Sequence, residues 1–292
     1  DIISRSTISP YDGGGDGRGP VGTVVEDAIH RGMVWFQAVG DNAGKEGVRY
    51  GSYHRWRFAD VDNDHFVEFA PGDEVLEFWC GDQIGLRWND SFFGGSGISD
   101  YDMYVFDPAT ANDPEAVPVA RSTNSQFRGA QPIERTTDCV PGWNYLVVWQ
   151  YAPGSSSNDL FEFAMDGTPL GEWRNAYSAA VPAADLQAHG VVAVGAIDPA
   201  AGGTVADYSS RGPTNTGGVS PAVVAPSCLT TFAYGPDCFA GTGASAAVVA
   251  GGAALVLEAG RVRWGSQLGP WVRQNATIER GSPGPDISYG WG

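Results

Sequence analysis

Acidic side chains recur at every second position in one short segment of this chain. Asp60, Asp62 and Asp64 alternate with other residues, and Glu68 follows shortly after them. Carboxylate oxygens at this spacing in a turn suit a hard cation such as calcium, which takes about 6 to 8 oxygen ligands. The sixth loop position is not glycine and the twelfth is not glutamate, so the segment is not an EF-hand. The alternative interpretation is a solvated acidic turn.

A second acidic cluster, Asp100, Asp102 and Asp107, has a looser spacing. It suggests a cation site of the same kind, and the alternative is again an ordinary solvated turn. Calcium is the cofactor that these patterns suggest, and its role would be to stabilise the structure rather than to take part in a reaction.

Serine chemistry requires a base next to the nucleophile and an acid that orients the base. Histidine is the usual base, and the chain contains four: His30, His54, His65 and His189. His30 falls at the end of a predicted helix, His54 and His65 in a β-rich region, and His189 in a turn. Each position suits an ordinary surface or core residue, and none indicates a catalytic base.

The chain contains four cysteines, Cys80, Cys139, Cys228 and Cys238, without the CxxC spacing of zinc sites. Four cysteines allow three pairings. Cys228 and Cys238 flank a short turn with glycine and proline, which favours a disulfide between them and leaves Cys80 to pair with Cys139. Disulfides persist in oxidising compartments, so we expect an extracellular location; the alternative is four buried free thiols in a cytosolic protein.

The 292 residues carry a formal net charge of −17, and Lys45 is the single lysine. Phosphate neutralisation needs clusters of basic residues, so this balance argues against nucleic acid as a partner. No run approaches about 18 apolar residues, which argues against a membrane span. The start, from Asp1 to Ser6, is not a signal peptide, and we expect that any export signal was removed or lies outside this sequence.

The first residues read as strand, helix and strand. Residues 1–8 are short and β-branched, and after a glycine-rich loop Pro20 opens a segment with helical spacing of apolar residues that Gly32 should end. Residues 33–39 form a continuous apolar run of the kind that a parallel strand buried on both faces shows. This order predicts a β-α-β unit with a right-handed crossover.

From residue 46 to residue 174 the helical periodicity disappears. Short aromatic and β-branched runs alternate with turns rich in Gly, Asp, Asn and Pro, which predicts an antiparallel β-sandwich or jelly roll. Residues 99–107 and 141–148 resemble the small β-sandwich domains often attached to secreted bacterial proteases. The candidate strands are 53–58, 66–69, 75–79, 84–88, 102–106, 145–151 and 160–165.

After residue 175 the α/β pattern returns, so we interpret the middle region as an insertion. Residues 191–197 and 223–226 are expected strands, and 242–259 form a helix rich in small residues that can lie close against a sheet. Each glycine within such a helix costs about 1 kcal/mol relative to alanine, so close packing must compensate. The predicted domains are an α/β core formed by 1–45 and 175–292, and an inserted domain formed by 46–174.

Three short segments stand out in the α/β parts: Tyr208-Ser-Ser-Arg-Gly-Pro-Thr214, Phe239-Ala-Gly-Thr-Gly-Ala-Ser-Ala-Ala-Val-Val-Ala-Gly-Gly-Ala-Ala-Leu255 and Ile287-Ser-Tyr-Gly-Trp-Gly292. In this order they resemble motifs of the subtilase family of serine endopeptidases. The resemblance covers roughly residues 1–45 and 175–292. It implies a subtilisin-like, mostly parallel three-layer core, of which this chain would carry only the later strands.

In this family a Gly-Thr-Ser segment supplies the nucleophilic serine, and the matching position here is Gly243. The resemblance also places Asp41 where the family has an Asn that donates a hydrogen bond to the oxyanion. An ionised carboxylate cannot donate, and losing even one neutral donor costs about 3 to 4 kcal/mol in related enzymes. A one-residue shift would give this role to Asn42 instead. Ser245 lies two helical positions beyond Gly243 and points about 200° away, so it does not replace the nucleophile.

The family's chain order is Asp, His, Ser, and the first two belong to Asp-x-Gly and His-Gly-Thr motifs upstream of Asp1. We therefore expect this chain to be part of a longer polypeptide, or to be completed by another chain. In either case another polypeptide segment or subunit would cover the strand from Asp1 to Ile8. An uncovered sheet edge with unpaired N–H and C=O groups is an aggregation hazard.

Two functions fit these observations, and they leave open whether the protein is an enzyme. The first is a secreted subtilisin-like protein that is catalytically incompetent, a pseudoprotease scaffold with a structural or binding role. The alternative is the C-terminal portion of a calcium-stabilised extracellular serine endopeptidase whose Asp and His lie upstream, which requires Gly243 and Asp41 to be substitutions or to be wrongly aligned with the family's positions. A carbohydrate-binding module is a further hypothesis, motivated by the ten tryptophans, although these fill a β-rich core more simply.

Overall fold

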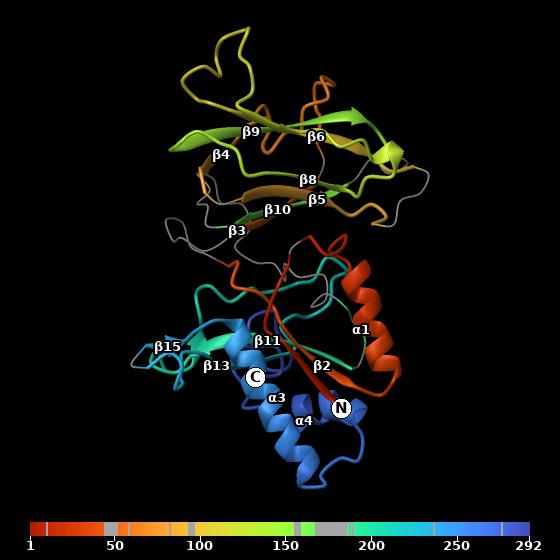
Figure 1. Ribbon diagram of the computed structural model, residues 1–292, viewed down its shortest axis with the longest axis vertical. Coiled ribbons are helices and arrows are strands. Elements are labelled where there is room, and N and C mark those ends of the chain that lie inside the picture. Colours follow the sequence, from red (N-terminus) through yellow and green to blue (C-terminus); the bar gives the residue numbers. More distant parts are fainter. Residues whose placement is uncertain are drawn as a thin grey trace. The chain divides into compact units, whose positions relative to one another are not determined.

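The computed structural model covers residues 1–292. It describes all of them except 10, 44–51, 58, 82, 93–96, 155–158, 167–185, 187, 189, 236 and 276, and for 52–57 and 164–166 it describes the backbone alone. The chain divides into two compact units (Figure 1). Unit 1 comprises Asp1–Ala43 and Tyr177–Gly292, and unit 2 comprises Gly44–Ala176.

A five-stranded sheet forms the centre of unit 1. Its strands are β1 (Ile2–Arg5), β2 (Val34–Ala38), β11 (Val191–Asp198), β12 (Thr204–Val205) and β13 (Val223–Pro226). The path runs β1-β2-β11-β12, β13 pairs with β11, and every pairing except β11 with β12 is parallel. All five residues of β2 and the first six of β11 are buried, as expected for parallel strands covered on both faces.

Helices cover both faces of this sheet, so unit 1 has three layers (Figure 1). They are α1 (Pro20–His30) on one side, and α3 (Thr242–Glu258) and α4 (Leu268–Asn275) on the other. Successive side chains of β2 alternate between the two layers, with Trp35 in the core beside α1 and Phe36 in the core beside α3. Among the described residues, no helix combines the length and apolar character that crossing a membrane requires.

Proline and glycine mark the limits of α1 as the sequence predicts. The helix begins at Pro20, and Gly32 adopts a left-handed φ of 82° just beyond its end. Strand β1 is shorter than predicted, because it ends at Arg5 and the chain then turns toward α3. There the Ser6 hydroxyl donates a hydrogen bond to the Gly243 carbonyl oxygen at 3.1 Å.

Unit 2 contains two four-stranded antiparallel sheets. Their strands are β3 (Ser52–Arg57), β4 (Leu76–Trp79), β5 (Gln83–Trp88), β6 (Asp100–Phe106), β7 (Ala120–Ser122), β8 (Ile133–Thr136), β9 (Trp143–Ala152) and β10 (Leu160–Asp166). The strand orders are β3-β10-β5-β8 and β4-β9-β6-β7. Leu86 and Phe161 of the first sheet and Met103 and Leu146 of the second belong to one buried cluster, so the two sheets share a hydrophobic core.

The structure corrects the strand predictions for unit 2 in two respects. Residues 66–69 form no strand; Phe66 makes a single bridge to Trp149. Strands β7 and β8 have no counterpart among the predicted strands, because both are short and largely polar. Glu134 of β8 is nevertheless fully buried, accepts hydrogen bonds from the Asn124 N–H and the Gln126 side chain, and has a pKa raised by its burial.

Both disulfides expected from the sequence are present. Cys80, directly after β4, is bonded to Cys139, shortly before β9, with 5.7 Å between their Cα atoms. Cys228 and Cys238 are bonded to each other around the short hairpin of β14 (Leu229–Thr230) and β15 (Cys238–Phe239). Each unit therefore holds one cross-link, and no cysteine is left as a free thiol.

We expect the disulfide of unit 2 to stabilise its unit more than the disulfide of unit 1. The Cys80–Cys139 bond closes a loop with a sequence separation of 59, against 10 for Cys228–Cys238, and the entropy removed from the unfolded chain grows with loop length. Replacing Cys80 and Cys139 by alanine should lower the free energy of unfolding by about 4 kcal/mol. Replacing Cys228 and Cys238 by alanine should lower it by about 3 kcal/mol. Urea unfolding of the two double variants measures the difference, and the reverse order would contradict it.

Candidate functional site

The residues that the motifs single out meet where strand β2 ends and helix α3 begins. The Gly40 N–H donates a hydrogen bond to the Thr242 hydroxyl at 3.1 Å, and the Thr242 N–H donates to the Asp41 carboxylate at 2.8 Å. The first N–H groups of a helix have no partner within the helix, and its dipole favours an anion at this end. Asp41 therefore acts as a cap that another element of the fold supplies to α3.

Asp41, rather than Asn42, faces the beginning of α3. The Asn42 backbone N–H donates instead to the Ser210 hydroxyl at 3.3 Å. The contact between Asp41 and the start of α3 requires glycine at position 241. The φ angle of Gly241 is 113°, and a Cβ atom there would lie 2.7 Å from an oxygen of Asp41. Of Asp41 and Asn42, Asp41 is therefore the one whose side chain contacts the start of α3.

Gly243 has no side chain and no room for one. A Cβ atom built there would lie 2.8 Å from the carbonyl oxygen of Ser6 and 3.0 Å from its Cβ atom. Contacts this short require the backbone to move, because the nearest atom belongs to the main chain and not to a flexible side chain. The position aligned with a nucleophile is therefore packed against the segment that follows β1.

The other hydroxyl groups near α3 have structural partners. Ser245 is fully buried and donates to the Ala225 carbonyl oxygen at 2.9 Å. Ser209, also buried, accepts a hydrogen bond from the Ala196 N–H at 3.0 Å. Ser210, which binds the Asn42 N–H, is buried as well. None of these three hydroxyls is placed to attack a substrate.

Tyr208 and Ser227 form a second polar contact at the start of α3. Ser227 lies outside the three sequence motifs, so no sequence pattern indicates this contact. The two hydroxyl oxygens lie 2.6 Å apart, and the Gly241 N–H donates to Ser227 at 2.9 Å. Both residues line a hollow of about 470 Å³ that also includes the Cys228–Cys238 disulfide. The hollow is a candidate binding surface beside the start of α3.

The histidines do not complete a catalytic arrangement in the part of the chain that the structure describes. His30 is exposed at the end of α1, and His65 is exposed in the turn after Asp64. The side chain of His54 and the whole of His189 lie outside the described residues. No hydrogen bond joins His30 or His65 to Asp41 or to the first turn of α3.

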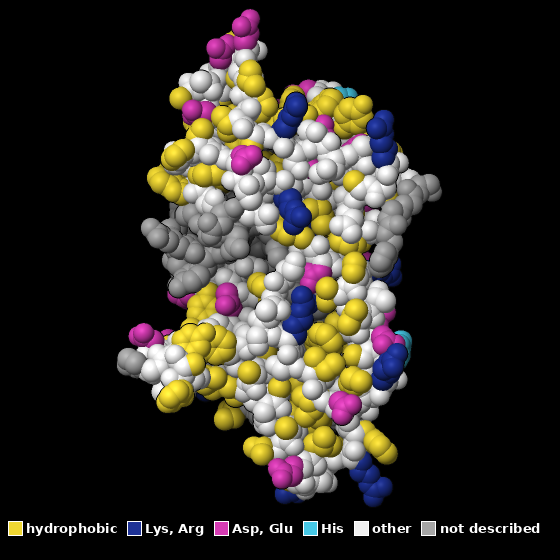
Figure 2. Space-filling view, viewed as in Figure 1, with side chains coloured by type: hydrophobic (Ala, Val, Ile, Leu, Met, Phe, Trp, Pro, Cys, Tyr) yellow, Lys and Arg dark blue, Asp and Glu magenta, His cyan; other side chains and the backbone are white. Residues whose placement is uncertain are grey.

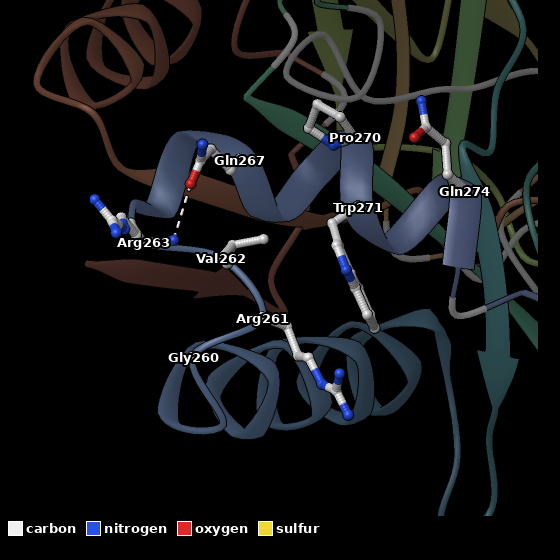
Figure 3. A pocket seen from close by; sticks show the side chains of 8 residues that line it. All are labelled: Gly260, Arg261, Val262, Arg263, Gln267, Pro270, Trp271 and Gln274. Atoms are coloured by element: carbon white, nitrogen blue, oxygen red, sulfur yellow. Dashed lines mark hydrogen bonds between the residues drawn. The ribbon is translucent and has the colours of Figure 1, made fainter.

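A second hollow, of about 450 Å³, lies between the end of α3 and α4. Figure 3 shows Trp271 reaching from α4 toward α3, beside Arg261 of the connecting loop. The Arg263 N–H donates to the Gln267 side chain at 2.9 Å, which fixes this loop. The lining contains no acid, thiol or hydroxyl, so it offers no nucleophile or base. On the face shown in Figure 2, basic side chains lie singly rather than in a patch.

The structure gathers three of the four predicted cation ligands. Carboxylate oxygens of Asp60, Asp62 and Asp64 lie within 4.8 Å of one another, whereas Glu68 is outside this group and buried. Asp60 accepts hydrogen bonds from the backbone N–H groups of Asp64 and His65, so the turn already uses part of its carboxylate.

Glu74 lies close enough to this group to respond to its charge. Its pKa is raised, first by burial and then by repulsion from Asp64, Asp62, Glu68 and Asp60. The group is therefore a concentration of negative charge that a cation would relieve.

The three carboxylates of the second acidic cluster do not converge in space as a set of metal ligands. Asp102 accepts a hydrogen bond from the Tyr104 hydroxyl at 3.0 Å, and Asp107 accepts from the Ala109 N–H in a turn. Asp100 is buried, and desolvation raises its pKa as it does for Asp102. Among the described residues, the carboxylate groups that could share a metal ion are those of residues 60, 62 and 64.

Comparison with known proteins supports a C-terminal part of the subtilase type. The model of the subtilase family matches residues 154–292. The structure of the Clostridium perfringens CspB protease superposes with a TM-score of 0.63 at 17% sequence identity, over 100% of this chain and 64% of that chain. The chain thus spans less than two thirds of that protein, and at this identity the likeness concerns the fold. No curated protein sequence matches the chain.

We expect Gly243→Ser to destabilise unit 1 without creating a reactive serine. The added atoms would over-pack the contact with Ser6, at a cost of about 1 to 3 kcal/mol in the free energy of unfolding. The matched control is Gly252→Ser in the same helix, where nothing lies within 4 Å of an added Cβ atom. Urea unfolding compares the two variants, and equal midpoints would contradict the steric account.

Proposed function

We infer, from the premise that the C-terminal part of this chain belongs to the subtilase family, that the protein is a catalytically inactive relative of its serine endopeptidases. The observation that carries this proposal is the hydrogen bond from the Thr242 N–H to the Asp41 carboxylate. In serine-protease chemistry, donors beside the nucleophile stabilise negative charge as it develops on the substrate oxygen. Here a negative charge of the protein already lies at this position and would repel a second one.

The size of these effects separates a slow enzyme from an inactive one. Losing a single oxyanion donor lowers turnover by about 10²- to 10³-fold. Asp41 replaces a donor by a charged acceptor, and Gly243 removes the attacking atom altogether. The neighbouring hydroxyls of Ser209, Ser210 and Ser245 are buried and bonded, so none takes over the role.

The role that we propose is structural or binding, in an extracellular setting. Two disulfides support that setting, because such bonds are rare where the cytosol keeps thiols reduced. Unit 2 supports an inserted antiparallel β-sandwich, because its two sheets share one core and it lies between the two segments of unit 1 in the chain. The extracellular setting is tested by isolating the native protein, denaturing it and titrating its free thiols. Four free thiols would contradict this setting.

We also propose that another polypeptide segment or subunit covers the β1 side of unit 1. Within the described residues, β1 pairs with β2 on one side only, which leaves an edge of unpaired backbone groups. On α3, Gly251 and Gly252 are exposed beside the exposed Leu255, so an apolar helix presents an uncovered face. Hydrogen exchange of the β1 amides in full-length material tests this proposal, and exchange as fast as in a free strand would contradict it.

Native full-length protein should hydrolyse no peptide and take up no serine-directed fluorophosphonate probe. The reason is the absence of an attacking hydroxyl at Gly243 together with the acidic cap on α3. A broad peptide library read by mass spectrometry measures turnover, and an active subtilisin-type protease under the same conditions is the positive control. Turnover that the probe abolishes would favour the alternative, in which the chain is the C-terminal portion of an active secreted endopeptidase.

We propose calcium as a structural ligand of Asp60, Asp62 and Asp64. A cation there would stabilise the folded protein by about 2.7 kcal/mol at a calcium concentration of 100 times Kd, and chelator should reverse the rise in Tm. Asp62→Asn should abolish this response, because Asp62 is the member of the group whose carboxylate accepts no backbone hydrogen bond within it. Asp138→Asn, at an exposed site of unit 2, is the control. An unchanged Tm at millimolar calcium would remove the proposal.

A further inference from the structure

Strand β9 has one buried side and one aromatic side. Its inward residues, Leu146 and Val148 among them, lie in the core of unit 2, whereas alternate residues point out of the opposite face of the sheet. Four of its five outward side chains are aromatic. The five are Trp143, Tyr145, Val147, Trp149 and Tyr151.

Neighbouring chain segments add rings to this same side, because residues directly opposite each other across antiparallel strands point the same way. The opposed pairs are Trp79–Trp143, Phe106–Tyr145, Tyr104–Val147 and Phe66–Trp149. The resulting surface, which we call the aromatic face, comprises Phe66, Trp79, Tyr104, Phe106, Trp143, Tyr145, Trp149 and Tyr151.

The rings at both ends of the aromatic face are open to solvent. Trp79 is 45% exposed, Trp143 is 44% exposed, and Tyr151 is 61% exposed. Trp79 and Trp143 pack edge to face with their ring centroids 5.5 Å apart, and Trp149 and Tyr151 do so at 5.6 Å. Such contacts hold the rings in place before a ligand arrives, which lowers the entropy lost on binding. Exposed aromatic side chains on one face of a sheet are candidates for an interaction surface.

The charge on the aromatic face is small. In the described part of this sheet, the acidic and basic side chains at its outward positions are Glu77, Asp100, Asp102 and Arg121. Asp100 and Asp102 are buried and accept hydrogen bonds from the Ser125 and Tyr104 side chains, which leaves Glu77 and Arg121, of opposite sign, closer to solvent. The whole chain carries a net charge of −17 and repels polyanions. Asp60, Asp62 and Asp64 add negative charge beside Phe66 at one edge and also repel polyanions, whereas the exposed outward positions of the sheet itself are balanced in charge and suit an uncharged partner.

We propose that the aromatic face binds an extended, neutral polysaccharide whose sugar rings lie flat on the aromatic rings. A pyranose ring with equatorial hydroxyls presents C–H groups on its faces, which pack on aromatic rings, and hydroxyls at its edge. The side chains of Tyr104, Glu77 and Arg121 supply hydrogen-bonding partners for such hydroxyls. A small ligand requires a concave pocket, whereas a sheet face suits a polymer. This proposal stands apart from the proposed function, since it holds whether or not unit 1 cleaves peptides.

Binding is measured by mixing the full chain with insoluble cellulose or with chitin and determining the protein that stays in solution. The wild-type protein should be depleted by at least one of these polymers, equally at low and at high salt. Trp143→Ala and Tyr151→Ala, at opposite ends of β9, should each weaken binding by about tenfold, which corresponds to roughly 1.4 kcal/mol. Both side chains are exposed, so the Tm should stay near that of the wild type.

Trp264→Ala is the matched control, because Trp264 is 67% exposed and belongs to unit 1. It should bind like the wild type. The proposal is overturned if neither polymer depletes the protein, if Trp264→Ala loses as much binding as Trp143→Ala, or if high salt abolishes binding. Retention on immobilised gelatin or casein, but on neither polysaccharide, would assign the aromatic face to a protein partner instead.

Discussion

The bond between the Thr242 N–H and the Asp41 carboxylate fixes the position of helix α3, and much of unit 1 depends on it. The buried side of α3 consists largely of Ala244, Ala246, Ala250 and Ala253, which let the helix approach the sheet closely. A surface of such small side chains gives little resistance to sliding along the sheet. Polar contacts at the helix start supply that resistance, and they place a carboxylate at this end of α3.

Local signals in the sequence were sufficient for the long elements of unit 1 and for the disulfides, but they did not indicate helix α4 or the short strands β12, β14 and β15. Continuous apolar runs indicate β2, β11 and β13, and Pro20 and Gly32 bracket α1. The motif around residue 243 and the segment around Asp41 meet at the start of α3, where the Thr242 N–H donates to the Asp41 carboxylate. The crowding of Gly243 by Ser6 could not be predicted, because it depends on how the chain turns after β1 and not on any local pattern.

Unit 2 shows the opposite case, in which composition gives the wrong impression of where side chains lie. Glu134 and the ion pair of Arg87 with Glu162 are buried, whereas Trp79 and Trp143 are exposed. The buried acids are tolerated because hydrogen bonds or an opposite charge satisfy them. The count of tryptophans therefore cannot tell a core from an aromatic surface; only the strand register separates the two.

The discontinuity of unit 1 has a consequence for how the protein is made. Trp35 of β2 pairs with Val191 of β11, and the whole of unit 2 lies between them in the chain. Unit 2 is contiguous, so it can fold on the ribosome before β11 has been synthesised. Through that interval the nascent chain displays the apolar residues of β2 without the strand that later pairs with them. The first segment of unit 1 thus stays without its partner strand β11 until the whole of unit 2 has been synthesised.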